Sequence, residues 1–171
     1  MENFRHAEEI LAAGNEWGEI QEAIRSIGEN DILNVHEALN RPLIETGRVG
    51  IAGGQTAINE MFRRKLLPPP RSWEGEPHLF ASRARDLSGW KMDFLKNRVG
   101  VEVSFNHAEA IPWTFTRLNI AGESESVVPE HRIDVGIAIF ATKELKAWAR
   151  MDQAERLRAK VNTQAGRSQS P

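Results

Sequence analysis

Two acidic residues, Asp93 and Glu102, occur in the segment 91–104, KMDFLKNRVGVEVS. Asp93 stands at the entry to a hairpin-like turn, and Glu102 lies mid-strand on the face opposite the alternating valines, so the turn can bring the two carboxylates together beside a sheet. Because close carboxylates repel each other, this arrangement favours a hard metal such as Mg²⁺, with the Val103 backbone carbonyl as a third oxygen. A metal there can activate water and stabilise charge on a phosphoryl oxygen. On spacing alone, a solvent-facing polar edge of a half-buried strand is the commoner explanation.

The helices that would support this segment are indicated by apolar residues at spacings of three and four. Trp17, Ile20, Ile24 and Ile27 predict a helix with Asn15 as its cap and Gly28 as its stop. A second helix is predicted after Gly53-Gly54, with Ile58, Met61, Phe62 and Leu66 on one face, and the run Pro68-Pro69-Pro70 ends it. The sequence predicts an irregular stretch over 30–54, mixed loop and short helix over 71–90, and a third helix over 143–150.

Three strands are predicted in the second half of the chain. Residues 99–105 alternate with period two, residues 111–120 (IPWTFTRLNI) have the composition of a strand, and residues 133–140 (IDVGIAIF) indicate a largely buried one. Helices followed by strands and a final helix favour one α/β layer structure. We therefore expect one domain over 1–150 and a polar tail over 151–171.

Composition limits the classes of protein that need to be considered. The chain has 171 residues, is 40% hydrophobic and contains no cysteine, which excludes disulfides, thiol nucleophiles and cysteine-based zinc sites. No membrane-spanning run or secretory signal is visible, so we expect a cytoplasmic protein that does not associate with membranes. The net charge is −2, but residues 62–98 carry 9 Lys/Arg against 4 Asp/Glu while residues 1–61 carry 4 against 11. A basic centre in a mildly acidic protein can bind phosphate locally.

The segment 91–104 matches the pattern D-x(8)-E-x-[K/Q/E] of the PD-(D/E)XK nucleases in its two acids and their spacing, with Ser104 at the last position, and more narrowly resembles the BglII/BstYI-type restriction endonucleases. Three further segments resemble the narrower group in the same order: residues 16–22 (EWGEIQE), 57–62 (AINEMF) and 133–136 (IDVG). The resemblance extends from about residue 16 to residue 150. It implies an α/β fold of the PD-(D/E)XK type, with a central mixed sheet flanked by helices.

The resemblance also implies roles for individual residues. Asp93 and Glu102 correspond to the metal-binding carboxylates, and Glu60 corresponds to a glutamate near the active site, although a solvated helix residue explains Glu60 equally well. Ser104 stands at the third motif position, where family members carry lysine or, in the narrower group, glutamine. A serine hydroxyl can hold a water but supplies no positive charge and reaches less far, so cleavage itself is left open by this departure.

Six residues near the motif are candidates for DNA contact. They are Asn106, His107, Lys91, Lys96, Arg98 and Lys143. Asn106 and His107 follow the active strand, where the resemblance implies contacts to base edges; a strand-ending turn is the alternative. The three basic residues that flank the acidic pair can draw phosphate toward it, whereas Lys143 is also explained as a solvated helix start.

Together these features predict a Mg²⁺-dependent type II restriction endonuclease. By resemblance it acts as a homodimer on palindromic double-stranded DNA, with a GATC-centred site and a 5′-phosphate product, alongside a cognate DNA methyltransferase. The alternative is a DNA-binding or partner-binding relative that retains the fold but has lost cleavage, owing to Ser104 and a C-terminus without the apolar strand usual in the family.

Overall fold

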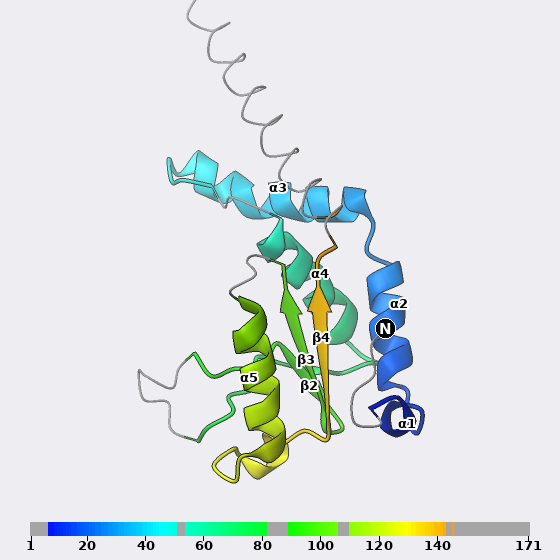
Figure 1. Cartoon of the computed structure of the whole chain (residues 1–171). Helices are drawn as coiled ribbons and strands as arrows, with labels where there is room; N and C mark the ends of the chain where they lie inside the picture. Colours follow the sequence, from blue (N-terminus) through cyan, green and yellow to red (C-terminus); the bar gives the residue numbers. More distant parts are fainter. Residues whose placement is uncertain (1–6, 51–53, 82–88, 106–109, 143–144, 146–171) are drawn as a thin grey trace, which may run out of the picture.

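The computed structural model describes residues 7–50, 54–81, 89–105, 110–142 and 145, and they form a mixed sheet with helices on both faces (Figure 1). The helices are α1 (Ala7–Leu11), α2 (Glu16–Arg25), α3 (Glu29–Glu45), α4 (Gln55–Leu66), α5 (Ala110–Glu123) and the 3₁₀ helix η1 (Pro129–His131). The strands are β1 (Glu74–Gly75), β2 (Phe94–Lys96), β3 (Val99–Ser104) and β4 (Val135–Phe140).

The sheet has the order β1-β2-β3-β4. β1 pairs with β2, and β2 with β3, in antiparallel fashion, whereas β4 runs parallel to β3 with Val99 opposite Val135 and Ser104 opposite Phe140. A parallel pair needs a long crossover, and α5 provides it on one face of the sheet. The predicted central mixed sheet flanked by helices is therefore present among the described residues.

The two faces of β3 pack against different helices. Val99, Val101 and Val103 are buried in a cluster with residues of α2, α3 and α4. Gly100 and Glu102 point to the other face, since successive side chains of a strand alternate. That second face is covered by α5 (Figure 1). The active-site candidate Glu102 thus lies between the sheet and α5.

Two of the predicted helices are confirmed. In α4 all four residues assigned to the apolar face are buried, and the helix ends just before the proline run. In α2 Ile20 is buried and Trp17 is half-buried, but Ile24 is exposed. Asn15 precedes α2 without a capping hydrogen bond from its side chain. The predicted stop at Gly28 is wrong, because α2 ends at Arg25 and Gly28 is the N-cap of α3, where its N–H donates to Asp31.

The prediction of an irregular stretch over 30–54 is wrong for residues 30–45, because α3 occupies Glu29–Glu45, whereas the described residues 46–50 are irregular. Ile32, Val35 and Leu39 recur at helical spacing and pack into the same cluster as α4. Several asparagines and Pro42, which lies inside the helix, obscure that periodicity in the sequence.

The prediction of a strand over 111–120 is also wrong, because α5 covers Ala110–Glu123. Its β-branched and aromatic residues favour a strand, but strand propensity depends strongly on context. Thr114 and Ala121 are fully buried and Leu118 is partly buried, which is the spacing of one helix face. Packing of that face on β3 and β4 stabilises the helix over the strand that the composition favours.

The remaining sequence predictions have mixed outcomes. β4 confirms the strand predicted over 133–140, but most of its residues are only half-buried because it is an edge of the described sheet. Over 71–90 the described part holds β1 and turns rather than a short helix. Leu145 is helical, whereas the rest of the predicted helix 143–150 and the tail 151–171 lie outside the described residues. None of the helices in the described part of the chain is long and apolar enough to cross a membrane.

Candidate active site

The acidic pair is placed by the hairpin of β2 and β3. Asn97 and Arg98 connect the strands, with φ of 46° and 64°. Two consecutive residues with positive φ are typical of the type I′ turn, whose twist matches that of a two-residue hairpin. In the resulting register Phe94 pairs with Val101, so Asp93 comes just before β2 at the level of Glu102. The predicted approach of Asp93 to the strand of Glu102 is therefore present.

Asp93 is fixed to β3 by one hydrogen bond. Its Oδ2 accepts from the backbone N–H of Val103 at 2.7 Å. In an antiparallel pair the N–H and C=O of one residue point to the same side of the strand, so the Val103 carbonyl also lies on the Asp93 side. β2 has ended at this level and leaves the Val103 backbone to the carboxylate. The geometry thus sets two carboxylates and one carbonyl around one point of β3.

Glu102 is the most deeply buried acid of the site, with a relative exposure of 1%. Its Oε2 lies 2.7 Å from Nη2 of Arg117 on α5, and its Oε1 has no hydrogen-bond partner among the described residues. Burial and the neighbouring charge of Asp93 raise the pKa of Glu102 to about 8, although Arg117 acts in the opposite direction. Desolvation therefore has a larger effect on the pKa of Glu102 than the ion pair with Arg117.

The pKa of Asp93 is also raised, again mainly because of burial. Burial raises the pKa of Asp93 and the charge of Glu76 adds to this, while the Val103 N–H, Arg117 and Arg63 lower it. Two acids with raised pKa values in one site lack enough positive charge to ionise together. A bound cation would supply that charge.

The oxygen donors fit a hard divalent cation. Such ions take carboxylate and backbone carbonyl oxygens and keep several waters. Among the described residues Glu102 Oε1 is a buried acceptor without a partner, and Asp93 is near enough for its charge to raise the pKa of Glu102. Within the described ranges no group of three or more His, Cys, Asp or Glu side chains converges, so the carbonyl and waters would complete the coordination.

Glu60 and Ser104 are placed differently with respect to the pair. Glu60 on α4 forms an ion pair with Arg64 at 2.9 Å, and no hydrogen bond or ion pair links it to Asp93 or Glu102 in the described structure. Ser104 ends β3 on the same face as Glu102 and is half-buried. Its hydroxyl is therefore near the pair, but it is short and neutral.

Of the predicted DNA contacts, Lys91 is nearest in sequence to Asp93. Its Nζ lies 3.7 Å from Oε2 of Glu76, which also pairs with Arg63 of α4. The N–H of Glu76 donates to the backbone carbonyl of Asp93 at 3.0 Å. Two cations thus gather beside Asp93, both held by one exposed carboxylate.

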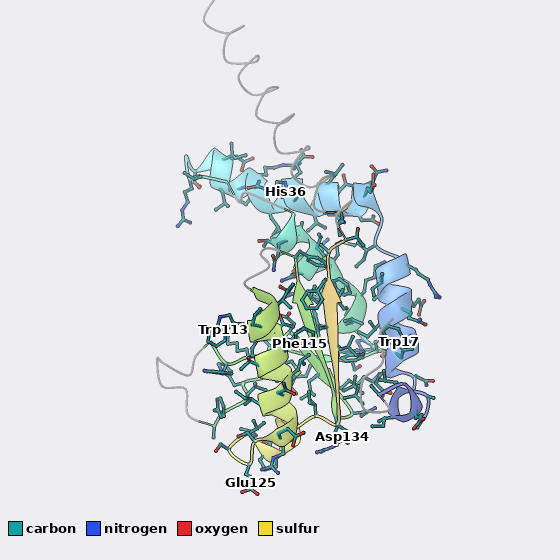
Figure 2. The ribbon with its side chains drawn as sticks, in the orientation of Figure 1. Trp17, His36, Trp113, Phe115, Glu125 and Asp134 are labelled. Atoms are coloured by element: carbon teal, nitrogen blue, oxygen red, sulfur yellow. The ribbon has the colours of Figure 1, made fainter. Side chains whose placement is uncertain are left out.

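Lys96 and Arg98 lie at the turn end of the hairpin and are engaged with other acids. Lys96 Nζ is 2.8 Å from Oε1 of Glu19 on α2, and the pair is largely buried. Arg98 donates twice to Asp134, at 2.7 and 2.6 Å. Asp134 lies where β4 begins, at the bottom of the view in Figure 2. The other three predicted contacts, Asn106, His107 and Lys143, lie outside the described residues.

Arg117 is the functional candidate that sequence reasoning missed. A strand over 111–120, as the composition predicts, gives no reason to bring Arg117 near Glu102. Helical periodicity of Thr114, Leu118 and Ala121 is the signal that identifies the buried face of α5, and Arg117 borders that face.

An acidic pair of one buried and one half-buried carboxylate beside a strand end, in a mixed sheet covered by helices, is an arrangement suited to phosphodiester hydrolysis. The family model described as restriction endonuclease BglII/BglIII matches residues 1–169, essentially the whole chain, and the chain belongs to this family. No curated protein and no solved structure matches it significantly. Family membership makes the protein a site-specific nuclease acting on DNA and confirms the resemblance found in the sequence.

Proposed function

We propose that the protein is a Mg²⁺-dependent type II restriction endonuclease with Asp93 and Glu102 as its metal ligands. The observation that carries the proposal is the buried Glu102 Oε1, which has no partner in the described structure, in a residue that lies across the hairpin from Asp93. Family membership supports the nuclease activity. We propose the identity of the ion, the recognition sequence and the cleavage products together with this activity.

Each residue of the site has a role that follows from its position. The Val103 N–H orients Asp93, and Arg117 holds Glu102 Oε2 while Oε1 stays open. A divalent ion held by these oxygens would lower the pKa of a bound water and stabilise charge on the scissile phosphate. Arg63 and Lys91 lie beside Asp93 and can draw the phosphate toward the carboxylates once it competes with Glu76.

The DNA and the assembly are proposed from the family. We propose cleavage of a palindromic, GATC-centred duplex site that leaves a 5′-phosphate and a 3′-hydroxyl. A homodimer matches the two-fold symmetry of such a site. A cognate DNA methyltransferase would protect the same site in the host, and both proteins would act in the cytoplasm.

The second candidate is a relative that binds DNA without cutting it. Ser104 favours it, because a short neutral side chain stands where the motif carries a longer polar or basic one. In that case duplex binding persists with a divalent ion present, but the DNA remains intact.

Cleavage of long natural duplex DNAs of known sequence tests the proposal. With Mg²⁺ the wild type is expected to give discrete fragments with a common end sequence and 5′-phosphates, and to linearise supercoiled plasmid by cutting both strands. Asp93→Asn is expected to slow cleavage by about 10²-fold or more. The asparagine oxygen can still accept from Val103 N–H, so the fold is preserved.

Asp31→Asn is the matched control, since it makes the same change in a carboxylate that also accepts a backbone N–H, that of Gly28, at the start of α3. Its cleavage should equal that of the wild type. Equal cleavage by Asp93→Asn would contradict the proposal, and Ca²⁺-dependent duplex binding without any Mg²⁺-dependent cutting would establish the second candidate instead.

A further inference from the structure

Arg117 is a cation that reaches the acidic pair from outside the family motif. It extends from α5, which covers the Glu102 face of the sheet, and its Nη2 lies 2.7 Å from Glu102 Oε2. The Arg117 side chain is 30% exposed, whereas that of Glu102 is 1% exposed. The pair therefore runs from a buried carboxylate toward solvent, the direction from which a DNA phosphate must approach.

The motif of this chain supplies no positive charge of its own, because Ser104 stands where the wider nuclease pattern carries lysine and the narrower group carries neutral glutamine. Ser104 follows Glu102 on the same face of β3, and its hydroxyl is neutral. Phosphodiester hydrolysis spreads negative charge over the phosphoryl oxygens, which two nearby carboxylates oppose. A cation from another helix or strand can offset this excess of negative charge.

Four other basic side chains of the described residues near the hairpin are held by carboxylates outside the acidic pair. They are Arg63 and Lys91 with Glu76, Lys96 with Glu19, and Arg98 with Asp134. Arg117 differs from these because its partner is Glu102 itself. A divalent ion held by Glu102 would weaken the attraction between Glu102 and Arg117, and the guanidinium would then be available to other acceptors in the site.

The guanidinium also has donors to spare. Its Nε is buried and has no hydrogen-bond partner in the described part of the chain. A guanidinium carries five N–H donors in a planar fork that matches two phosphate oxygens. One group can therefore donate to Glu102 before DNA binds and to phosphate afterwards.

We propose that Arg117 contacts the scissile phosphate and provides, from α5, the positive charge that Ser104 does not. This inference rests on the proposed nuclease function and adds a catalytic residue to it.

The test is a double-mutant cycle of Arg117 and Ser104 in the full chain, read by single-turnover cleavage at saturating Mg²⁺. Arg117→Gln is expected to slow cleavage by about 10²-fold or more, as removal of a transition-state donor does. Ser104→Lys in the wild-type background supplies the reference rate for the double variant. In the Arg117→Gln background it should recover at least about 10-fold, because the missing charge is restored from β3. Arg41→Gln, which removes an exposed arginine of α3, is the matched control and should cleave normally.

Ca²⁺ binding to the DNA-free protein, measured by calorimetry, provides a readout that does not depend on cleavage. Arg117→Gln should bind Ca²⁺ at least as tightly as the wild type, since a competing cation is removed, whereas Glu102→Gln should lose binding. Weaker Ca²⁺ binding in Arg117→Gln, without rescue of cleavage by Ser104→Lys, would show that Arg117 only holds Glu102 in place and would overturn the inference.

Two further outcomes have equally definite meanings. Wild-type rates in Arg117→Gln would overturn the inference while slow cleavage by Asp93→Asn leaves the nuclease function standing; absence of cleavage in the wild type would overturn both. If Arg117→Gln does not fold, the double variant of Arg117→Gln with Ser104→Lys tests the inference instead, because it again places a cation beside Glu102. A folded double variant that cleaves supports the role of charge, and a folded one that does not cleave contradicts it.

Discussion

Glu102 shows at the level of one residue why this site requires a cation. A buried carboxylate is costly unless it is paired and hydrogen-bonded, and Glu102 satisfies this for only one of its two oxygens in the described structure. Natural proteins leave few such groups, and those that remain commonly serve a function. The unsatisfied Oε1 is therefore better explained by ligand binding than by stability.

The raised pKa of Glu102 leads to a prediction on stability in the absence of metal. The folded pKa is about 8, above the ordinary value of 4.5, so between these values the unfolded chain releases a proton that the folded protein retains. This contribution to the free energy of unfolding is present at low pH and disappears as the pH rises to about 8. Urea unfolding in a chelator should show Glu102→Gln gaining on the wild type as the pH increases over this range.

Added Mg²⁺ provides the control for that experiment. It should stabilise the wild type more strongly as the pH rises, because the ionised carboxylate is the ligand, and should have little effect on Glu102→Gln. Parallel pH profiles of the two proteins would contradict the assignment of the buried proton to Glu102.

At the level of elements, α2 fastens the hairpin that carries the site. Glu19 accepts hydrogen bonds from Lys96 Nζ at 2.8 Å and from Trp73 Nε1 at 2.7 Å. The buried Glu16 accepts from the side chain of Asn97 in the turn at 2.7 Å. Part of the acidic excess of the N-terminal third thus neutralises and orders the basic hairpin, and Lys96 has a structural partner beside its proposed contact with DNA.

This arrangement predicts that Glu19→Ala destabilises the protein by about 1–3 kcal/mol, because it leaves Lys96 and the Trp73 indole N–H without their acceptor in a largely buried place. Chemical denaturation measures the change. Glu37→Ala on α3 removes an exposed ion pair with Arg41 and should stay within about 0.5 kcal/mol of the wild type. Equal effects of the two substitutions would argue against the fastening role of α2.

At the level of the whole molecule, charge is distributed so that a protein of net charge −2 can present a local phosphate-binding surface. Arg63 and Lys91 gather beside Asp93, and Arg117 approaches Glu102 from the other layer of helices. Each of these cations faces a carboxylate. DNA phosphates therefore compete with internal ion pairs, which limits general affinity for polyanions.

We accordingly predict that specific duplex binding with Ca²⁺ depends strongly on salt, with each neutralised phosphate adding about −0.9 to the slope of log K against log salt. Lys91→Glu should flatten the slope by about one for each phosphate that residue 91 no longer neutralises, because attraction there becomes repulsion. Arg25→Glu, on the exposed last turn of α2, changes the net charge equally and should leave the slope unchanged. Fluorescence anisotropy over a salt series measures both, and equal slopes for all three proteins would exclude Lys91 from the interface.

The sequence by itself determined the features that depend on local chemistry. Alternation over 99–105 and the approach of Asp93 to Glu102 follow from strand period and a two-residue turn, both properties of neighbouring residues. The helix α4 follows from apolar spacing and the proline run in the same way. The family resemblance, carried by ordered short segments, likewise needed no coordinates.

Tertiary structure alone decided the features that join distant parts of the chain. Residues 111–120 have strand-forming composition, yet they form α5 because its buried face packs on β3 and β4. The partners of Lys96 and Arg98 lie on α2 and before β4, so their ion pairs are invisible to spacing. The contact of Arg117 with Glu102 exists only once α5 covers the sheet, since propensity and periodicity describe one segment at a time while a pair of charges depends on how two segments pack.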